Sequence, residues 1–327
     1  MISDPQILCL GEILFDCLAD QLGKELVDVT SWTAYAGGAP ANVACALTKL
    51  GTQAAFIGCL GQDKPGNELV SLLEKTEINI TGIQRHSTAP TRKVYVTRSL
   101  KGERNFAGFG QIETHKFADT QLLAKNLPES IFINAKYLVI GTLLLAYPNS
   151  KQALEKALEL AKKHRVSIFV DINWRPMFWE DLEAAQPLIM SLLHQSDFLK
   201  CSQEEAQWLL NTETPQKIAQ YFPNLQGILV TAGEKGCNYY LGKNQGQIDT
   251  FPVKVIDTTG AGDSFVAGFL HQSCLKGDLL LSDPKIAREA IIYASAVGAL
   301  TTTQPGAIAA QPTGEEVSLF LTQNQQG

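Results

Sequence analysis

The feature of this sequence that most limits its fold is a regular alternation of short apolar runs with longer segments of helical spacing. The apolar runs include "ILCL" (7–10), "YLVIG" (137–141) and "GILVTAG" (227–233), and helical patterns such as "SKQALEKALELAKKH" (150–164) lie between such runs. Continuous apolar strands that alternate with helices are typical of a mostly parallel sheet with helices on both faces. We therefore expect an α/β fold whose ligands bind beyond the carboxyl ends of the strands.

Two segments, residues 14–36 and about 89–112, interrupt this alternation. They carry patterns such as "VYVTRS" and "RNFAGF" and contain no long helical pattern. Such alternation predicts antiparallel strands that leave the main sheet. Because no internal repeat or linker divides the chain, we expect one domain, residues 1–327, in which these strands form a small lid over the ligand edge.

Charge and cysteine usage exclude several classes of protein. There are 27 Lys and Arg against 33 Asp and Glu, a net charge of −6 with no basic block, which argues against a nucleic-acid partner. Seven cysteines without a C-x-x-C pair are typical of reduced thiols inside a cell. The start "MISDPQILCLGE" lacks signal-peptide features and the longest apolar run is too short for a bilayer, so we expect a cytoplasmic protein without membrane contact.

The stretch "DTTGAGDSFVAGF" (257–269) places small residues directly before a helix expected from near Gly262 to Lys276. Bare backbone amides at a helix N-terminus, together with the helix dipole, favour a bound phosphate. Asp263 then has two interpretations, as a helix N-cap or as a base that takes a proton from the group attacking the phosphate. A carboxylate beside an anion site repels the bound anion, so its presence there is explained only if it takes part in the reaction. This favours the interpretation of Asp263 as a base.

A second glycine cluster, "AGGAPANVACALTKLG" (36–51), also begins a helix, with Pro40 in its first turn and Gly51 at its end. Gly37 and Gly38 expose backbone to a ligand, and Asn42 offers both a donor and an acceptor. Taken alone, this is an ordinary helix entry. The chain has no G-x-x-x-x-G-K-[ST], no G-x-G-x-x-G after its first strand, and no H-R-D with D-F-G, which disfavours P-loop enzymes, dinucleotide dehydrogenases and protein kinases.

Together the two clusters resemble the two signatures of the ribokinase-like (PfkB-type) carbohydrate kinases, and the resemblance extends from "GEILFD" (11–16) to "GAIAAQPT" (306–313). It implies a ribokinase-like fold with a β-strand lid, through which family members often form homodimers, and an ATP-dependent kinase activity. It also implies that Asp263 is the base acting on a sugar hydroxyl, with an anion hole made by Gly260, Ala261 and Gly262.

The resemblance implies further binding residues, each of which alone would be an ordinary loop or turn residue. The sugar site would comprise Asp16, Gly37, Gly38 and Asn42. The loop "TAGEKG" (231–236) would line the nucleotide with Thr231, Gly233 and Gly236. Where the family often has N-x-x-E for Mg²⁺ and phosphate, this chain has "SQEE", with Ser202 at the Asn position and Glu205 at the Glu position. A K⁺ site would use Asp257, Thr259 and carbonyls near 301–306.

The segment "DINWRPMFW" (171–179) bears on the sugar. It resembles the fructokinase branch, which has Asn and Arg where this chain has Asn173 and Arg175. It also resembles 2-keto-3-deoxygluconate kinases, in which an Arg binds the substrate carboxylate. The prediction is a fructokinase that uses ATP, Mg²⁺ and K⁺. A 2-keto-3-deoxygluconate kinase or other sugar kinase, and a catalytically silent sugar-binding protein, stay open as alternatives.

Overall fold

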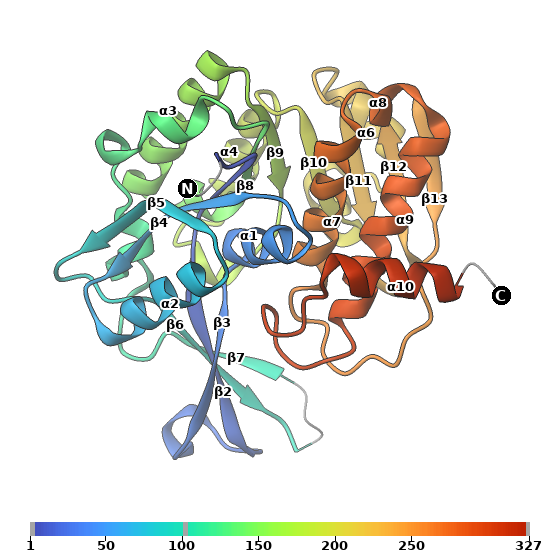
Figure 1. The fold of residues 1–327 in the computed structure, drawn as a ribbon. Helices are drawn as coiled ribbons and strands as arrows, with labels where there is room; N and C mark the ends of the chain where they lie inside the picture. The colour runs from blue at the N-terminus through green and yellow to red at the C-terminus, as the bar shows by residue number, and fades with distance from the viewer. Residues whose placement is uncertain (1–3, 101–103, 325–327) are drawn as a thin grey trace.

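The computed structural model describes residues 4–100 and 104–324, and its centre is a nine-stranded sheet (Figure 1). From one edge to the other the strands are β13 (Asn244–Ile248), β12 (Cys237–Leu241), β11 (Gly227–Thr231), β10 (Phe198–Ser202), β9 (Ser167–Asp171), β8 (Tyr137–Gly141), β1 (Ile7–Leu10), β4 (Ala54–Gly61) and β5 (Asn79–His86). All neighbours are parallel except β11 with β12 and β12 with β13. These last strands follow one another through short connections, which permit only antiparallel pairing. The mostly parallel sheet is confirmed.

Helices cover both faces of this sheet (Figure 1). One face packs against α1 (Ala39–Lys49), α2 (Lys64–Lys75), α7 (Ala261–Lys276), α8 (Leu279–Ser282), α9 (Pro284–Thr301) and α10 (Gly314–Asn324). The other packs against α3 (Pro148–His164), α4 (Ala185–Leu193), α5 (Gln203–Leu210) and α6 (Pro215–Tyr221). Strand β1 shows why the strands are apolar throughout: Ile7 and Cys9 join one core cluster, and Leu8 and Leu10 join the other.

A second, four-stranded sheet lies below the main sheet in Figure 1, in the order β3-β2-β6-β7. Its strands are β2 (Leu14–Leu22), β3 (Trp32–Gly37), β6 (Lys93–Arg98) and β7 (Arg104–Gly108). The two interrupting segments therefore supply strands outside the main sheet, as expected; residues 101–103 lie outside the described residues. The expectation of antiparallel pairing is wrong for β2 and β6, which are parallel. Between β2 and β6 the chain passes through β3, α1, β4, α2 and β5. No hairpin therefore fixes the relative direction of β2 and β6.

No helix within residues 4–100 and 104–324 is long and apolar enough to cross a bilayer. All seven cysteines are free, and six of them are buried.

Candidate active site

The start of α7 has the open backbone that the sequence predicts. Gly260, the residue before the helix, has a φ of +77°, and a Cβ there would lie 2.8 Å from the Cβ of Ala307. The amides of Gly260 and Gly262 meet no backbone acceptor in the described part of the chain, whereas the Ala261 amide donates to Thr258 O at 3.3 Å. The positive end of the helix dipole and these free amides can bind a phosphate group.

Asp263 lies in the first turn of α7 and faces another helix. Its Oδ2 accepts a hydrogen bond from Asn42 Nδ2 at 2.7 Å, and it makes no cap to its own helix. Asn42 is in the first turn of α1, which packs beside α7. Part of Asp263 stays accessible, yet its surroundings bury the carboxylate and raise its pKa, while Asn42 and the charges of Lys200 and Arg175 oppose the rise. The N-cap interpretation therefore does not account for this carboxylate.

The other end of the Asn42 side chain lacks a partner. Its Oδ1 is buried, and no group among the described residues donates a hydrogen bond to it. The backbone oxygen of Asn42 accepts from Gln311 Nε2 at 2.8 Å, so the residue itself is fixed. Buried polar atoms are nearly always satisfied. An acceptor left open beside Asp263 fits a ligand hydroxyl.

The structure brings Asp16, Gly37 and Gly38 together where the four-stranded sheet meets α1. A Cβ on Gly37 would lie 2.8 Å from Asp16 Oδ2. Gly38 precedes α1 with a φ of +108°, and a Cβ there would lie 2.5 Å from Glu12 O. Burial raises the pKa of Asp16 to about 6, against the opposing charges of Arg104 and Arg175. Glycine at positions 37 and 38 thus allows the Asp16 carboxylate and the Glu12 backbone to lie close to this segment.

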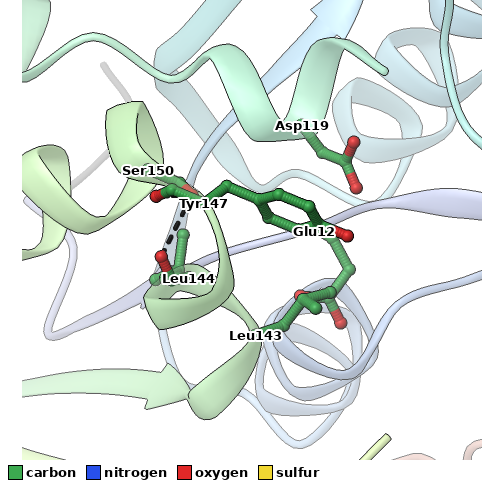
Figure 2. A pocket seen from close by; sticks show the side chains of 6 residues that line it. All are labelled: Glu12, Asp119, Leu143, Leu144, Tyr147 and Ser150. Carbon is green, nitrogen blue, oxygen red and sulfur yellow. Dashed lines mark hydrogen bonds between the residues drawn. The ribbon is translucent and has the colours of Figure 1, made fainter. Parts of the chain in front are cut away.

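Glu12 also belongs to this region, although it was not predicted from the sequence. It follows β1, and its Oε1 accepts from the Ala39 amide at 3.0 Å. Burial raises its pKa to about 7. Figure 2 shows Glu12 beside Tyr147 and Asp119 in the wall of a cavity of about 10 Å³. That volume is at the lower limit for one water, so this cavity is not a sugar site. The signal was a carboxylate between two apolar runs in "ILCLGEILF".

A buried ion pair joins two central strands, β9 and β10, and the sequence did not predict it either. Lys200 Nζ lies 3.0 Å from Asp171 Oδ1 and 3.2 Å from Oδ2, and both side chains are less than a tenth exposed. The two residues are direct neighbours in the β9–β10 register. The signal in the sequence was a charged residue inside each of two apolar strands, in "DFLKCS" and "VSIFVD". Charges are rarely buried without a partner or a function.

Ser202 and Glu205 form a capping box at the start of α5. The Ser202 hydroxyl accepts from the Glu205 amide, and Glu205 Oε2 accepts from the Ser202 amide at 2.7 Å. Glu205 Oε1 accepts from the Trp174 amide, also at 2.7 Å. Each carboxylate oxygen of Glu205 thus accepts a hydrogen bond from one backbone amide. Since an ionised carboxylate accepts about four hydrogen bonds, Glu205 keeps capacity for the water shell of an ion.

The predicted nucleotide loop connects β11 and β12. Thr231 is the register neighbour of Ser202, so both side chains lie at the carboxyl ends of adjacent strands. Gly236 has a φ of +86°, and a Cβ there would lie 2.0 Å from Ile248 O, so packing alone requires a glycine. Gly233 has a φ of +56° and open space around it. Neither glycine makes a contact that joins it to Asp263.

Asp257 and Thr259, the predicted cation ligands, already hold an arginine. Arg104 Nη2 lies 2.8 Å from Asp257 Oδ2, and Arg104 Nη1 donates to the Thr259 hydroxyl. The same carboxylate accepts from the Gly306 amide at 2.9 Å and from the amide and hydroxyl of Thr259. Arg104 begins β7, so this contact joins the four-stranded sheet to the loop before α7.

Arg175 follows β9 and is exposed. Its Nη1 donates to the backbone oxygen of Trp174 at 2.9 Å, and no carboxylate of the described residues lies within ion-pair distance. Its charge opposes the rise that burial causes in the pKa values of Asp16 and Asp263.

Known proteins resemble this chain over nearly its whole length. The family model described as "pfkB family carbohydrate kinase" matches residues 4–314. The chain belongs to the PfkB family of carbohydrate kinases.

Relatives of this PfkB-family chain include a protein described as "Probable fructokinase-5" from Arabidopsis thaliana. It is 37% identical over 324 residues, which cover 98% of each protein. The solved structure of a fructokinase with bound ATP from Xylella fastidiosa is 31% identical, with a TM-score of 0.88, and covers 98% of this chain and 99% of the other. A fructokinase double mutant from Vibrio cholerae O395, in a fructose-, ADP- and potassium-bound form, is 26% identical with a TM-score of 0.83, covering 98% and 99%.

Within this PfkB-family fold, the predicted site residues fall into three groups. Asp263 and Asn42 meet at the start of α7 beside the anion cradle, and Asp16, Gly37 and Gly38 meet at the joint of the second sheet. Ser202, Glu205 and Thr231 lie at the strand ends farther along the main sheet. Lys200 lies between the first and third groups, since a Cβ on Gly262 would be 3.3 Å from its Nζ.

Proposed function

We propose that this protein is an ATP-dependent fructokinase, which transfers the γ-phosphoryl group of ATP to the 6-hydroxyl of D-fructose. The observation that carries the proposal is the position of Asp263, a desolvated carboxylate held by Asn42 in the first turn of a helix whose leading amides are open. The full-length similarity to fructokinases supports fructose as the sugar.

Asp263 acts as the base. Burial raises its pKa, so the carboxylate accepts a proton more readily than an exposed Asp does. It remains a weaker base than an alkoxide, so it takes the proton late, as the phosphoryl group arrives. The amide of Asn42 fixes its orientation, and the free amides of Gly260 and Gly262 stabilise the charge on the transferring group.

Asp16 and Asn42 orient the sugar. Asp16 at the sheet joint accepts hydrogen bonds from sugar hydroxyls when it is ionised, and the open Oδ1 of Asn42 accepts another. Gly37 and Gly38 leave the room that this approach needs. A site built for particular hydroxyls strongly rejects analogues that lack them.

The nucleotide binds at the strand ends beyond β10 and β11, along Ser202, Thr231, Gly233 and Gly236. Mg²⁺ is ordinarily held by ATP phosphates, waters and one or two carboxylates, and it neutralises phosphate charge when bound. Glu205 fits this role through a water, because each of its oxygens accepts a single amide and retains a lone pair. Ser202 can hold a further water.

K⁺ does not fit the predicted site in this arrangement. The Asp257 carboxylate already accepts four donors, two on each oxygen, and one of them is the guanidinium of Arg104. A carboxylate offers about four lone-pair sites. A monovalent ion would therefore have to displace Arg104, and we derive no step of the reaction through it.

Arg175 favours a second candidate, 2-keto-3-deoxygluconate kinase. Its guanidinium has no carboxylate partner among the described residues, and its charge acts on both Asp16 and Asp263. An arginine in this state can bind a substrate carboxylate through two parallel hydrogen bonds.

The deciding experiment offers the purified protein ATP and Mg²⁺ with D-fructose, D-ribose, adenosine, D-glucose and 2-keto-3-deoxygluconate, and follows ADP release. We expect D-fructose to give the highest kcat/KM and fructose 6-phosphate as the product. Arg175→Ala is compared with Arg288→Ala, an exposed arginine on α9. A preference for the keto acid that is lost only in Arg175→Ala would replace fructose with the second candidate. Sugar binding without ADP release would instead indicate a catalytically silent protein.

We further propose that the protein acts in the cytoplasm, which suits its free cysteines, and that it pairs through the outer strands of the four-stranded sheet. Sedimentation of the protein at several concentrations tests the pairing, and cell fractionation tests the location.

A further inference from the structure

Lys200 is a buried cation directly beside the anion cradle. It lies on β10, and its ammonium forms hydrogen bonds only with Asp171 among the described residues. An ammonium has three N–H donors. Because both contacts go to one carboxylate, at least one donor remains for another acceptor.

Gly262 lies close to this ammonium. A Cβ on this glycine would be 3.3 Å from Lys200 Nζ, closer than most side chains tolerate. The ammonium therefore lies against the first turn of α7, on the same turn that carries the open amide of Gly262 and the carboxylate of Asp263. Glycine at 262 allows the cation and the helix to approach each other.

The carboxylate of Asp171 compensates the buried charge of this ammonium. An ammonium with a free donor, held by this carboxylate next to an anion cradle, is suited to an incoming phosphate.

We propose that Lys200 contacts the phosphoryl group during its transfer, and that Asp171 positions the ammonium for this contact. The inference rests on the proposed kinase function. In the step, a bond forms between the sugar oxygen and the γ-phosphorus, and the bond to the bridging oxygen of ADP breaks. The hydroxyl proton goes to Asp263, and Lys200 stays protonated and stabilises charge on the phosphoryl oxygens.

The competing explanation is a purely structural ion pair. Removing one partner of a buried pair leaves an uncompensated charge and can unfold a protein, whereas replacing both partners is often tolerated. The decisive variant is therefore Lys200→Met/Asp171→Asn, accompanied by Lys200→Arg, which keeps the charge. The matched control is Arg92→Met/Asp119→Asn, because these residues form the other ion pair with both partners buried in the described part of the chain.

We measure kcat and KM for fructose, and the thermal shifts that ATP and fructose each produce. In Lys200→Met/Asp171→Asn we expect kcat to fall about 10²–10³-fold, as for loss of one oxyanion-stabilising group. The fructose-induced shift should persist and the ATP-induced shift should shrink. Lys200→Arg should retain more activity than the double variant, and the control should lose stability while keeping its kcat and both ligand shifts.

A folded Lys200→Met/Asp171→Asn protein with the kcat and the ATP-induced shift of the unmodified protein would overturn the proposal. So would a control variant that loses kcat to the same extent, since the effect would then belong to any buried pair. If the unmodified protein phosphorylates no sugar, the proposed function fails. In that case, the ATP-induced thermal shift of Lys200→Met/Asp171→Asn still tests whether Lys200 contacts the bound nucleotide.

Discussion

At the scale of single residues, the Asn42 side chain connects the proposed base with the proposed sugar site. Its Nδ2 fixes Asp263, and its buried Oδ1 is open for a hydroxyl. The hydroxyl that donates to Oδ1 has a single proton, so it is a neighbour of the reacting hydroxyl, whose own proton stays free for Asp263; one amide thus orients both the base and the sugar. Such positioning can supply a large part of the acceleration in phosphoryl transfer.

Asp263→Asn should lower kcat roughly 10²–10⁴-fold, because the amide cannot accept the sugar proton. The fold should persist, since an Asn oxygen still accepts from Asn42. Steady-state kinetics and a melting curve test this.

Asp263→Ala is matched with Asp283→Ala, where Asp283 is a true cap that accepts hydrogen bonds from the Lys285 and Ile286 amides of α9. The control should lose about 1 kcal/mol of stability and no activity; near-normal kcat in Asp263→Asn would contradict its role as the base.

At the scale of elements, the backbone at the two ends of α7 offers a matched pair of glycines. Gly260 has a φ of +77° and is packed against Ala307, whereas Gly277, after the last turn, has a φ of +55° and nothing within 4 Å of an added Cβ. Both require the left-handed region, but only Gly260 belongs to the anion cradle.

Gly260→Ala should therefore lower kcat by at least about tenfold, since a misplaced cradle amide stabilises less transition-state charge. Gly277→Ala should destabilise the fold by roughly 1–3 kcal/mol through backbone strain alone. Urea unfolding and initial rates, measured on both variants, separate the two effects. Equal kcat values for the two variants would show that strain, not cradle geometry, governs the rate.

Glu12 links β1 to the start of α1 and makes stability depend on pH. Its folded pKa is raised from 4.5 to about 7, chiefly by burial, with Asp119 and Asp263 adding to the rise. A carboxyl with a raised folded pKa contributes stability that is fully present below about pH 4.5 and is lost as pH rises through 7. The variant Glu12→Gln has no carboxyl to ionise and so does not lose this stability. Its free energy of unfolding minus that of the unmodified protein should therefore increase by about 3 kcal/mol between pH 4.5 and pH 8. Urea unfolding at both pH values tests this, and a pH-independent difference would contradict it.

At the scale of the whole molecule, the site lies between two sheets. Asp16 and Arg104 come from the four-stranded sheet, whereas Asp263 and Asp257 belong to the chain around α7. Arg104 joins the two parts, and its side chain is 45% exposed. An ion pair this exposed contributes about 0–1 kcal/mol to stability, so its main effect is on position.

Arg104→Ala should free the Asp257 carboxylate for a monovalent ion. We expect KCl, compared with choline chloride at equal ionic strength, to raise the melting temperature and kcat of this variant more than those of the unmodified protein. Arg98→Ala is the control, because Arg98 pairs with Arg104 in the β6–β7 register but bonds only to the backbone oxygens of Ala19 and Asp20 among the described residues. An identical K⁺ response in all three proteins would contradict competition at Asp257.

Much of the fold follows from local pattern. The runs "YLVIG" and "ILCL" coincide with β8 and β1, and α7 begins at Ala261, one residue before the expected start. The parallel pairing of β2 with β6 was not predictable in this way, because it joins segments separated by an excursion through the main sheet. The capping box of Ser202 and Glu205 was readable in "SQEE", but the resemblance directed attention to a metal instead.

The sequence by itself determined the strand-helix alternation, the two glycine clusters and Asp263 as a candidate base, because periodicity, helix starts and bare backbone are properties of neighbouring residues. Only the tertiary structure decided which groups meet. Asn42 and Asp263 are 221 positions apart, Arg104 and Asp257 are 153 apart, and Lys200 reaches Asp171 and Gly262 from a different strand. These contacts depend on strand order and helix packing, which bring the ends of separate elements to one edge of the sheet.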